Sequence, residues 1–162
     1  MISKKMSSEL NKQLNKEYYS AYFYLAMAAY TESLGFKGFA NWFHIQFNEE
    51  LDHAKKFYKY IVDQNEKVIL EKIDKPEGEF ESLKDVFKKT YAHEQYITKC
   101  INQLMDLSLE EKDHATRIFL QWFVTEQLEE ENMAKDVMDK LKLGGDKGQG
   151  LLMLDSILGG RK

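Results

Sequence analysis

Apolar residues recur at alternating three- and four-residue steps in four stretches of the chain, as they do along the buried face of an amphipathic helix. The four stretches cover about 7–34, 36–64, 82–107 and 108–143. The first shows the pattern plainly, with inward positions at Leu10, Leu14, Ala21, Tyr24 and Ala28. The pattern predicts an all-α protein with four helices of similar length.

Signals at the ends of these stretches indicate how the predicted helices are connected. Gly35 ends the first helix as a C-terminal cap, and so tight a turn makes the first two helices antiparallel neighbours. Ser82 with Asp85 has the spacing of an N-terminal capping box, so we expect the third helix to begin there. Ser108 with Glu111 has the same spacing, which places the start of the fourth helix just after Ser108.

The 17-residue link between the second and third predicted helices, 65–81, contains Pro76 and Gly78. Fully extended, it can span roughly 55 Å, whereas the second helix is about 45 Å long. The link can therefore run the whole bundle and make these two helices parallel. We expect a four-helix bundle with one long crossover. A floppy surface loop is the alternative, but long structureless connections are uncommon in compact domains.

A short apolar segment follows the glycine-rich stretch 144–150. It has five large aliphatic residues within eight positions, Leu151, Leu152, Leu154, Ile157 and Leu158. Such a segment is too short and too apolar to be stable as a lone, solvent-exposed helix. We expect a fifth helix at about 147–158 that docks on another surface, either of this bundle or of another subunit.

Length and composition narrow the class of protein. A chain of 162 residues fits one domain, 1–162, with the bundle at about 7–143. The net charge of −4, with Lys interspersed among the acidic residues, disfavours a nucleic-acid partner. The chain start lacks an apolar leader and no run can span a bilayer, so we expect a cytoplasmic protein without membrane contact. The lone Cys100 excludes an internal disulfide and is expected to be a buried, inert thiol.

Polar residues interrupt the inward face of every predicted helix near its middle. Helical spacing places one carboxylate inside the first and third helices, a Glu-x-x-His pair inside the second, and an amide with a carboxylate inside the fourth. The residues are Glu17, Glu50, His53, Glu94, Gln127 and Glu130. Adjacent helices would bring these side chains to one level of the bundle.

Two interpretations of these buried carboxylates differ in where the compensating charge comes from. Buried salt bridges would need cations, but no inward position is Lys or Arg, and burying each unpaired ion costs several kcal/mol. Metal ions would compensate four carboxylates and one imidazole better. Oxygen-rich ligands with a single imidazole suit iron or manganese rather than structural zinc. The number of ligands favours two metal ions over one.

Four motifs around these positions resemble the bacterial non-haem ferritins over nearly the whole chain. The motifs are NKEYYSAYFYLAMAAY around Glu17, FNEELDHAKKFYKYI around Glu50 and His53, YAHEQYITKCINQL around Glu94, and FLQWFVTEQLEEE around Gln127. The family's fold is a ferritin-like four-helix bundle whose Glu and Glu-x-x-His residues project inward. The resemblance therefore implies the same fold as the helical pattern does.

The resemblance also implies roles for individual residues. Glu17, Glu50 and His53 would hold one iron; Glu50 as a bridge, Glu94 and Glu130 would hold the second, with Gln127 close by and Tyr24 as the electron-donating tyrosine. A third iron would bind the set Glu49, Glu126 and Glu129 with a share of Glu130. The alternative for that third set is a solvated acidic face.

The function implied by the resemblance is iron storage with ferroxidase activity. Fe(II) would be oxidised by dioxygen or peroxide, and ferric oxide mineral would be stored inside a hollow shell of 24 identical subunits with the short fifth helix at the symmetry axes. Haem is not expected, because Leu51 stands where haem-bearing bacterioferritins carry a ligating Met. The second Glu-x-x-His is also replaced, by Gln127-Leu128-Glu129-Glu130. We expect no ligand role for His44, His93 or His114.

Three rival classes remain to be compared with this hypothesis. A rubrerythrin-type peroxidase would carry a Cys-based iron module, which a single cysteine cannot form. A DNA-protecting mini-ferritin would place its iron site between subunits and often bears basic tails. An inert helical scaffold would not oxidise Fe(II) faster than a variant that lacks Glu50 and His53.

Overall fold

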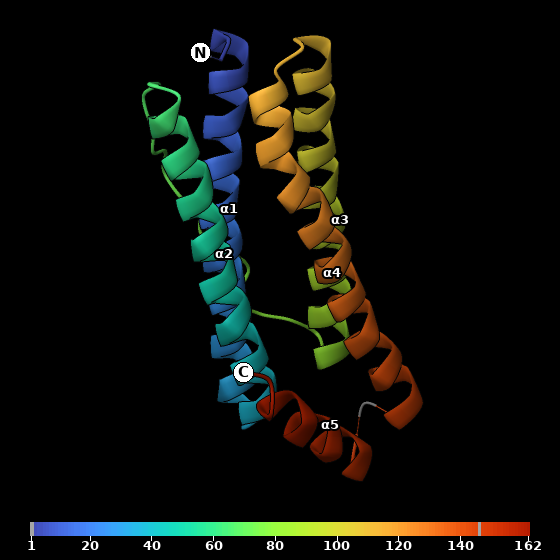
Figure 1. The fold of residues 1–162 in the computed structure, drawn as a ribbon. Coiled ribbons are helices and arrows are strands. Elements are labelled where there is room, and N and C mark those ends of the chain that lie inside the picture. Colours follow the sequence, from blue (N-terminus) through green and yellow to red (C-terminus); the bar gives the residue numbers. More distant parts are fainter. Residues whose placement is uncertain (1, 146) are drawn as a thin grey trace.

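The computed structural model describes residues 2–145 and 147–162, which form five α-helices and no strand. The helices are α1 (Lys4–Ser33), α2 (Lys37–Asp63), α3 (Leu83–Glu110), α4 (His114–Gly144) and α5 (Gln149–Gly159). Helices α1 to α4 lie side by side as a bundle, and α5 crosses one end of it (Figure 1). The prediction of an all-α four-helix bundle with a short fifth helix is confirmed. None of the helices described is long and apolar enough to cross a membrane.

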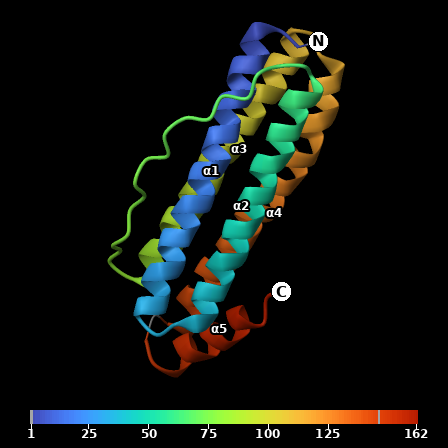
Figure 2. The same cartoon turned by 90° about the vertical axis from the view of Figure 1, so that its left-hand side faces the viewer.

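The long connection between α2 and α3 runs along the outside of the bundle beside α1 (Figure 2). Two asparagines of α1 bind this connection through its backbone carbonyl and amide groups. Asn11 donates to the carbonyl of Lys67 (3.1 Å) and accepts from the amide of Ile69 (2.7 Å). Asn15 donates to the carbonyl of Ile69 and accepts from the amide of Glu71, both at 2.8 Å. The predicted crossover is therefore present, and it makes α2 and α3 parallel.

Most helix ends follow the signals in the sequence. Ser82 caps α3 by accepting from the amide of Asp85, as the capping-box spacing predicts. Gly35 follows α1 with a φ of 85°, a conformation that glycine adopts without strain. Helix α1 begins a few residues before the predicted start, because Ser3 accepts from the amide of Met6 and caps it there.

The predicted start of the fourth helix after Ser108 is wrong. Ser108 lies inside α3, where its hydroxyl donates to the carbonyl of Met105 (2.7 Å) instead of capping a new helix. The chain turns at Lys112, which has a φ of 55°. Asp113 then caps α4 by accepting from the amide of Thr116 (3.0 Å). The capping-box spacing also occurs within helices, so spacing alone could not separate the two cases.

The apolar core consists of two clusters, one toward each end of the bundle. Near α5, aromatic side chains such as Phe39, Phe43 and Phe87 form the first cluster. At the opposite end, Leu10 and Phe57 belong to a second cluster. Every helix of the bundle contributes to both clusters, and the buried residues between them along each helix are largely polar. The polar layer predicted from the sequence therefore lies at mid-depth, between two apolar layers.

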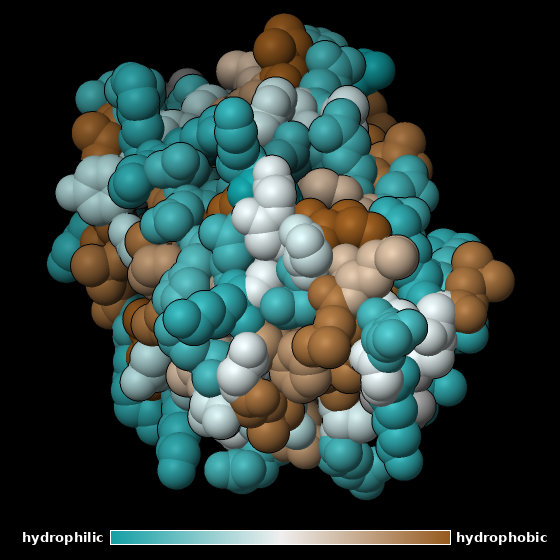
Figure 3. Space-filling model, turned by 90° about the horizontal axis from the view of Figure 1, so that it is seen from below, coloured by the Kyte–Doolittle hydropathy of each residue, from teal (hydrophilic) through white to brown (hydrophobic). Residues whose placement is uncertain are grey.

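Helix α5 has one buried and one exposed apolar face. Leu151, Leu154 and Leu158 are buried in the cluster that includes α2 and α4. Leu152 and Met153, on the other face, are 64% and 68% exposed. Apolar side chains are visible in patches among polar ones at this end of the molecule (Figure 3). One face of α5 therefore docks on this bundle, as expected, and its other apolar face stays exposed in the single chain.

Close backbone packing at Gly38 determines how α5 sits on α2. A Cβ atom at Gly38 would lie 1.6 Å from the carbonyl oxygen of Asp155, which a real structure cannot accommodate. The adjacent amide of Phe39 donates to the Asp155 carboxylate (3.0 Å) and secures the same contact. Any side chain at position 38 must therefore push α5 away from α2.

We expect Gly38→Ala to destabilise the docking of α5 by about 1–3 kcal/mol, the usual range for overpacking. The measurement is amide hydrogen exchange, which should speed up in α5 before it does in α1 to α4. Gly78→Ala is the matched control, since a Cβ there meets no atom within 4 Å. Equal exchange in α5 for the two variants would show that this close approach does not hold the helix.

Candidate metal centre

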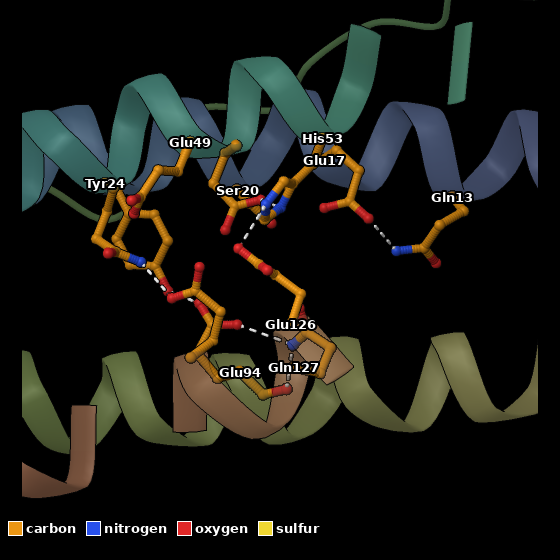
Figure 4. Close-up of polar contacts among 12 residues, drawn as sticks. Gln13, Glu17, Ser20, Tyr24, Glu49, His53, Glu94, Glu126 and Gln127 are labelled. Atoms are coloured by element: carbon orange, nitrogen blue, oxygen red, sulfur yellow. Dashed lines mark hydrogen bonds and ion pairs between the residues drawn. The ribbon is translucent and has the colours of Figure 1, made fainter. Parts of the chain in front are cut away.

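The side chains predicted to face inward do meet at one level of the bundle. Glu17 comes from α1, Glu50 and His53 from α2, and Glu94 from α3. Each of these residues, like Gln127 and Glu130 of α4, is at most 2% exposed. In the close-up, Glu17 and His53 on one side face Glu94, Glu126 and Gln127 on the other across the interior of the bundle (Figure 4).

Two overlapping groups of side chains have the spacing that a metal ion requires. Glu17, Glu50 and His53 each offer a ligand atom, and these atoms lie within 4.8 Å of one another. His53, Glu126 and Glu130 form a second such group. The two ring nitrogens of His53 face different carboxylates: Nδ1 lies 3.2 Å from Glu50, and Nε2 lies 3.7 Å from Glu126. His53 therefore stands between the two groups.

In three of the carboxylates, one oxygen accepts a hydrogen bond from a neutral side-chain amide. Gln13 donates to Glu17 and Gln46 donates to Glu130, both at 2.7 Å. Gln127 donates to Glu94 at 3.0 Å. Gln13 and Gln46 were not among the residues predicted for the site, although both are buried. The signal was present, because Gln13 precedes Glu17 by one helical turn and Gln46 precedes Glu50 by the same step.

Three buried carboxylate oxygens lack a hydrogen-bond partner within the part of the chain that the structure describes. They are one oxygen each of Glu17, Glu50 and Glu130. For Glu50, the nearby His53 nitrogen is close but does not have the geometry of a hydrogen bond. A buried charged oxygen without a partner costs several kcal/mol. Three such atoms in one interior layer fit a metal ion as their shared partner.

Burial raises the pKa of all four inward glutamates. The pKa values of Glu50 and Glu130 lie well above the usual 4.5, because desolvation penalises the charged form and the neighbouring carboxylates repel it. Desolvation also raises the pKa of Glu17, and it raises that of Glu94 to about 7 despite the hydrogen bonds from Tyr24 and Gln127. Protons would therefore compete with a metal ion for these oxygens.

Tyr24 lies directly beside the ligand set. Its hydroxyl donates to Oε1 of Glu94, and its ring is fully buried against Phe43 and Phe23. Desolvation and the charge of Glu94 raise the pKa of Tyr24 well above 10, which keeps the phenol protonated. The tyrosine singled out by the sequence resemblance is thus one hydrogen bond away from a candidate ligand.

The three residues predicted to add a third iron position have different surroundings. Glu126 lies near Glu130, as the prediction requires, and near His53, which the prediction did not include. Glu49 instead forms an ion pair with Arg161 at 2.8 Å. Glu129 is exposed. Glu126 alone therefore belongs to one of the ligand groups that the described residues form, and the third position stays a prediction.

The residues for which no ligand role was expected lie outside both ligand groups. His93 is buried against the ring of Phe23 and shares a 2.8 Å hydrogen bond with Ser20, and burial lowers its pKa to about 4. His44 is exposed near Glu32. Cys100 is buried, and its sulfur lies 3.2 Å from the ammonium group of Lys16, a contact that the sequence did not indicate.

The fold and the site together define a class: single-chain four-helix bundles that gather carboxylates and one imidazole in a polar layer inside the core. The family model of the ferritin-like domain matches residues 7–144, and the chain belongs to this family.

Individual relatives agree with that assignment. The bacterial non-heme ferritin of Campylobacter jejuni is 43% identical over 158 residues, covering 98% of this chain and 95% of that protein. The bacterial non-heme ferritin of Staphylococcus epidermidis is 40% identical, covering 99% and 97%. An open pore ferritin from the hyperthermophilic archaeon Archaeoglobus fulgidus superposes with a TM-score of 0.98 at 44% identity, covering 100% of both chains. The resemblance drawn from the four motifs is confirmed.

The pKa shifts predict how the stability of the metal-free protein depends on pH. The folded state keeps a proton on Glu94 up to about pH 7, whereas the unfolded chain releases it near 4.5. The folded state then binds more protons, so the free energy of unfolding falls as the pH rises between these values. At about 1.4 kcal/mol per pKa unit, the free energy of unfolding should fall by on the order of a few kcal/mol through Glu94 as the pH rises from 4.5 to 7.

Thermal unfolding of metal-free protein between pH 4.5 and 7 measures this effect. We expect the midpoint to fall with rising pH in the wild type and to fall less in Glu94→Gln, which cannot titrate at that position. Glu32→Gln, an exposed carboxylate, is the control and should keep the wild-type slope. A slope in Glu94→Gln as steep as that of the wild type would contradict the assigned cause.

Proposed function

We propose that this chain is the subunit of an iron-storage ferritin that oxidises Fe(II) to Fe(III) inside its own four-helix bundle. The observation that carries the proposal is the buried layer of Glu17, Glu50, Glu94 and Glu130, three of which keep an oxygen without a partner among the described residues. Family membership supports the same reading, as do relatives named as non-heme ferritins.

Two ferrous ions are the proposed occupants of the layer. The group of Glu17, Glu50 and His53 has the spacing for the first ion. Glu50 as a bridge, Glu94 and Glu130 are assigned to the second. The contact between Glu126 and His53 adds another oxygen on that side. Oxygen ligands with one imidazole are suited to iron and leave positions for water or an oxidant.

The proposed reaction transfers one electron from each of two ferrous ions. With dioxygen as oxidant, two Fe(II) give two Fe(III), and dioxygen takes up two electrons and two protons to form hydrogen peroxide. Peroxide as oxidant would take two electrons and two protons to form two water molecules. The phenol of Tyr24, hydrogen-bonded to Glu94, is assigned the role of an alternative donor: it can give one electron and one proton in place of one ferrous ion, and a later Fe(II) then reduces the tyrosyl radical.

Storage requires a compartment, and we propose a closed shell of 24 copies of this chain, with ferric oxide inside. The exposed apolar face of α5 supports this proposal, because Leu152, Met153 and Ile157 need a partner surface. The ligand groups lie within a single chain, unlike the inter-subunit site expected of a DNA-protecting mini-ferritin. We place the protein in the cytoplasm, a reducing compartment in which proteins rarely carry disulfides, because the chain has a single cysteine.

The oxidation step is tested by adding Fe(II) aerobically to Glu50→Ala, His53→Ala protein. Loss of two ligands should slow the appearance of ferric absorbance at least tenfold, since losing only an outer hydrogen-bond partner of a metal ligand costs about 10–100-fold. The matched control removes an exposed Glu–His pair, Glu32→Ala with His44→Ala, and should keep the wild-type rate. Identical rates in all three proteins would dismiss the ferroxidase proposal.

The shell is tested by the mass of the native particle. A 24-subunit assembly of 19.1 kDa chains has a mass of about 460 kDa, which light scattering after size exclusion measures directly. Replacing two exposed apolar residues, Leu152→Ser and Ile157→Ser, should shift the population toward smaller species because that face loses its apolar contacts. A monomeric or dimeric wild type would exclude a storage shell while leaving the oxidation chemistry open.

A further inference from the structure

Arg161, two residues after the end of α5, reaches back to the bundle beside the candidate metal centre. The chain end lies next to α2 (Figure 1). One guanidinium nitrogen donates to Glu49 at 2.8 Å, and another donates to Oε1 of Gln46 at 2.6 Å and lies 3.5 Å from the carbonyl of Trp42. The guanidinium stacks over the Trp42 ring at 4.9 Å and lies 3.7 Å from the sulfur of Met133.

The backbone of this segment is held as firmly as the side chain. Asn41 of α2 donates to the carbonyl of Arg161 at 3.1 Å and to that of Leu158 at 3.3 Å. The side chain of Arg161 is only 18% exposed. The Arg161 side chain is therefore held in one place by two charge-assisted hydrogen bonds and by stacking on an aromatic ring. Such an arrangement is more specific than an ordinary surface ion pair.

A chain of hydrogen bonds connects Arg161 to the metal centre through Gln46. Gln46 accepts from Arg161 with its oxygen, so its amide nitrogen is the group that points to Glu130, to which it donates at 2.7 Å. The guanidinium thereby fixes which way the amide faces. One oxygen of Glu130 is occupied by this bond, and the other is left without a partner among the described residues.

Arg161 binds one of the carboxylates that the sequence resemblance assigns to a third iron position, Glu49. Glu126 and Glu130 already belong to one ligand group, and Glu49 is the further carboxylate that a third ion would need. That carboxylate oxygen is bonded to Arg161. A metal ion and a guanidinium are both cations attracted to the same carboxylate, so a guanidinium already bound to Glu49 weakens the binding of an ion there.

We propose that Arg161 is a built-in cation that competes with a third metal ion for Glu49 and orients Gln46 toward Glu130. This inference rests on the proposed function, because it assumes that two metal ions fill the inner layer. A third ion binds Glu49, Glu126 and Glu130 only when the guanidinium leaves. Arg161 is thus a positioning residue that limits the chain to two ions until its guanidinium leaves Glu49.

Calorimetric titration of metal-free protein with Zn(II), which has no redox chemistry, tests the competition apart from iron oxidation. Wild type should bind two ions per chain tightly. Arg161→Gln should gain a third ion at least tenfold more tightly than wild type does, and Arg161→Lys should keep the wild-type value because its ammonium still pairs with Glu49. Lys162→Gln, which removes an exposed neighbouring charge, is the matched control and should bind like wild type.

The outcomes of this titration separate the two proposals. A wild type that binds no metal contradicts the proposed function and this inference with it. Two tight ions in wild type, with an unchanged third-site affinity in Arg161→Gln, overturn only the inference. An equal gain in Lys162→Gln also overturns it, since general charge would then be the cause. Adding Glu49→Gln to Arg161→Gln should abolish the third ion.

A second measurement keeps Arg161 in place and follows its departure. The chain has two tryptophans, so Trp122→Phe leaves Trp42, over which the guanidinium stacks, as the fluorescent reporter. The emission should change with the third equivalent of Zn(II) and stay constant through the first two. A third ion that binds without changing the emission of Trp42 would overturn the competition.

Discussion

The structure depends on one electrostatic constraint, which is that four carboxylates are buried in a bundle core whose inner layer contains no Lys or Arg among the described residues. Each unpaired buried charge costs several kcal/mol, and this cost must be borne by the rest of the fold. Two apolar clusters, one on each side of the polar layer, hold the four helices together so that the layer cannot open to water. The cost falls when protons or metal ions enter the layer, which couples the stability of the fold to its chemistry.

The choice of partners inside the layer follows from the same constraint. Gln13, Gln46 and Gln127 each satisfy one carboxylate oxygen with a neutral N–H donor. A Lys or Arg in their places would satisfy the same oxygen and also neutralise its charge, and the attraction for a metal ion would then be lost. An amide orients a carboxylate and leaves its charge in place. Side chains that orient metal ligands commonly act in this way.

The helical periodicity of the sequence was enough to predict the bundle and the layer, and the length of the link 65–81 was enough to predict the crossover. Glu17, Glu50, Glu94 and Glu130 could be placed inside because their spacing from large apolar residues is fixed by helix geometry. Gln13 and Gln46 were within reach of the same argument. The turn between α3 and α4 was not, because Ser108 can bond either to a following amide or to a preceding carbonyl, and only the packed structure decides which.

The contact of Arg161 with Glu49 joins residues 112 positions apart, and no local pattern indicates it. It depends on where α5 ends, and so on the close approach of α5 to α2. Helical spacing turns Glu49 toward a neighbouring face but cannot say which cation it meets there. Charges at the rim of the site, such as Arg161, are therefore set by tertiary packing, whereas charges inside the layer are set by helical period. Among the charges that oppose the desolvation raising the pKa of the buried glutamates, Lys16 acts on Glu17 and Arg161 acts on Glu130 from outside the layer. They ease the burial of the carboxylates while leaving the interior free for metal ions.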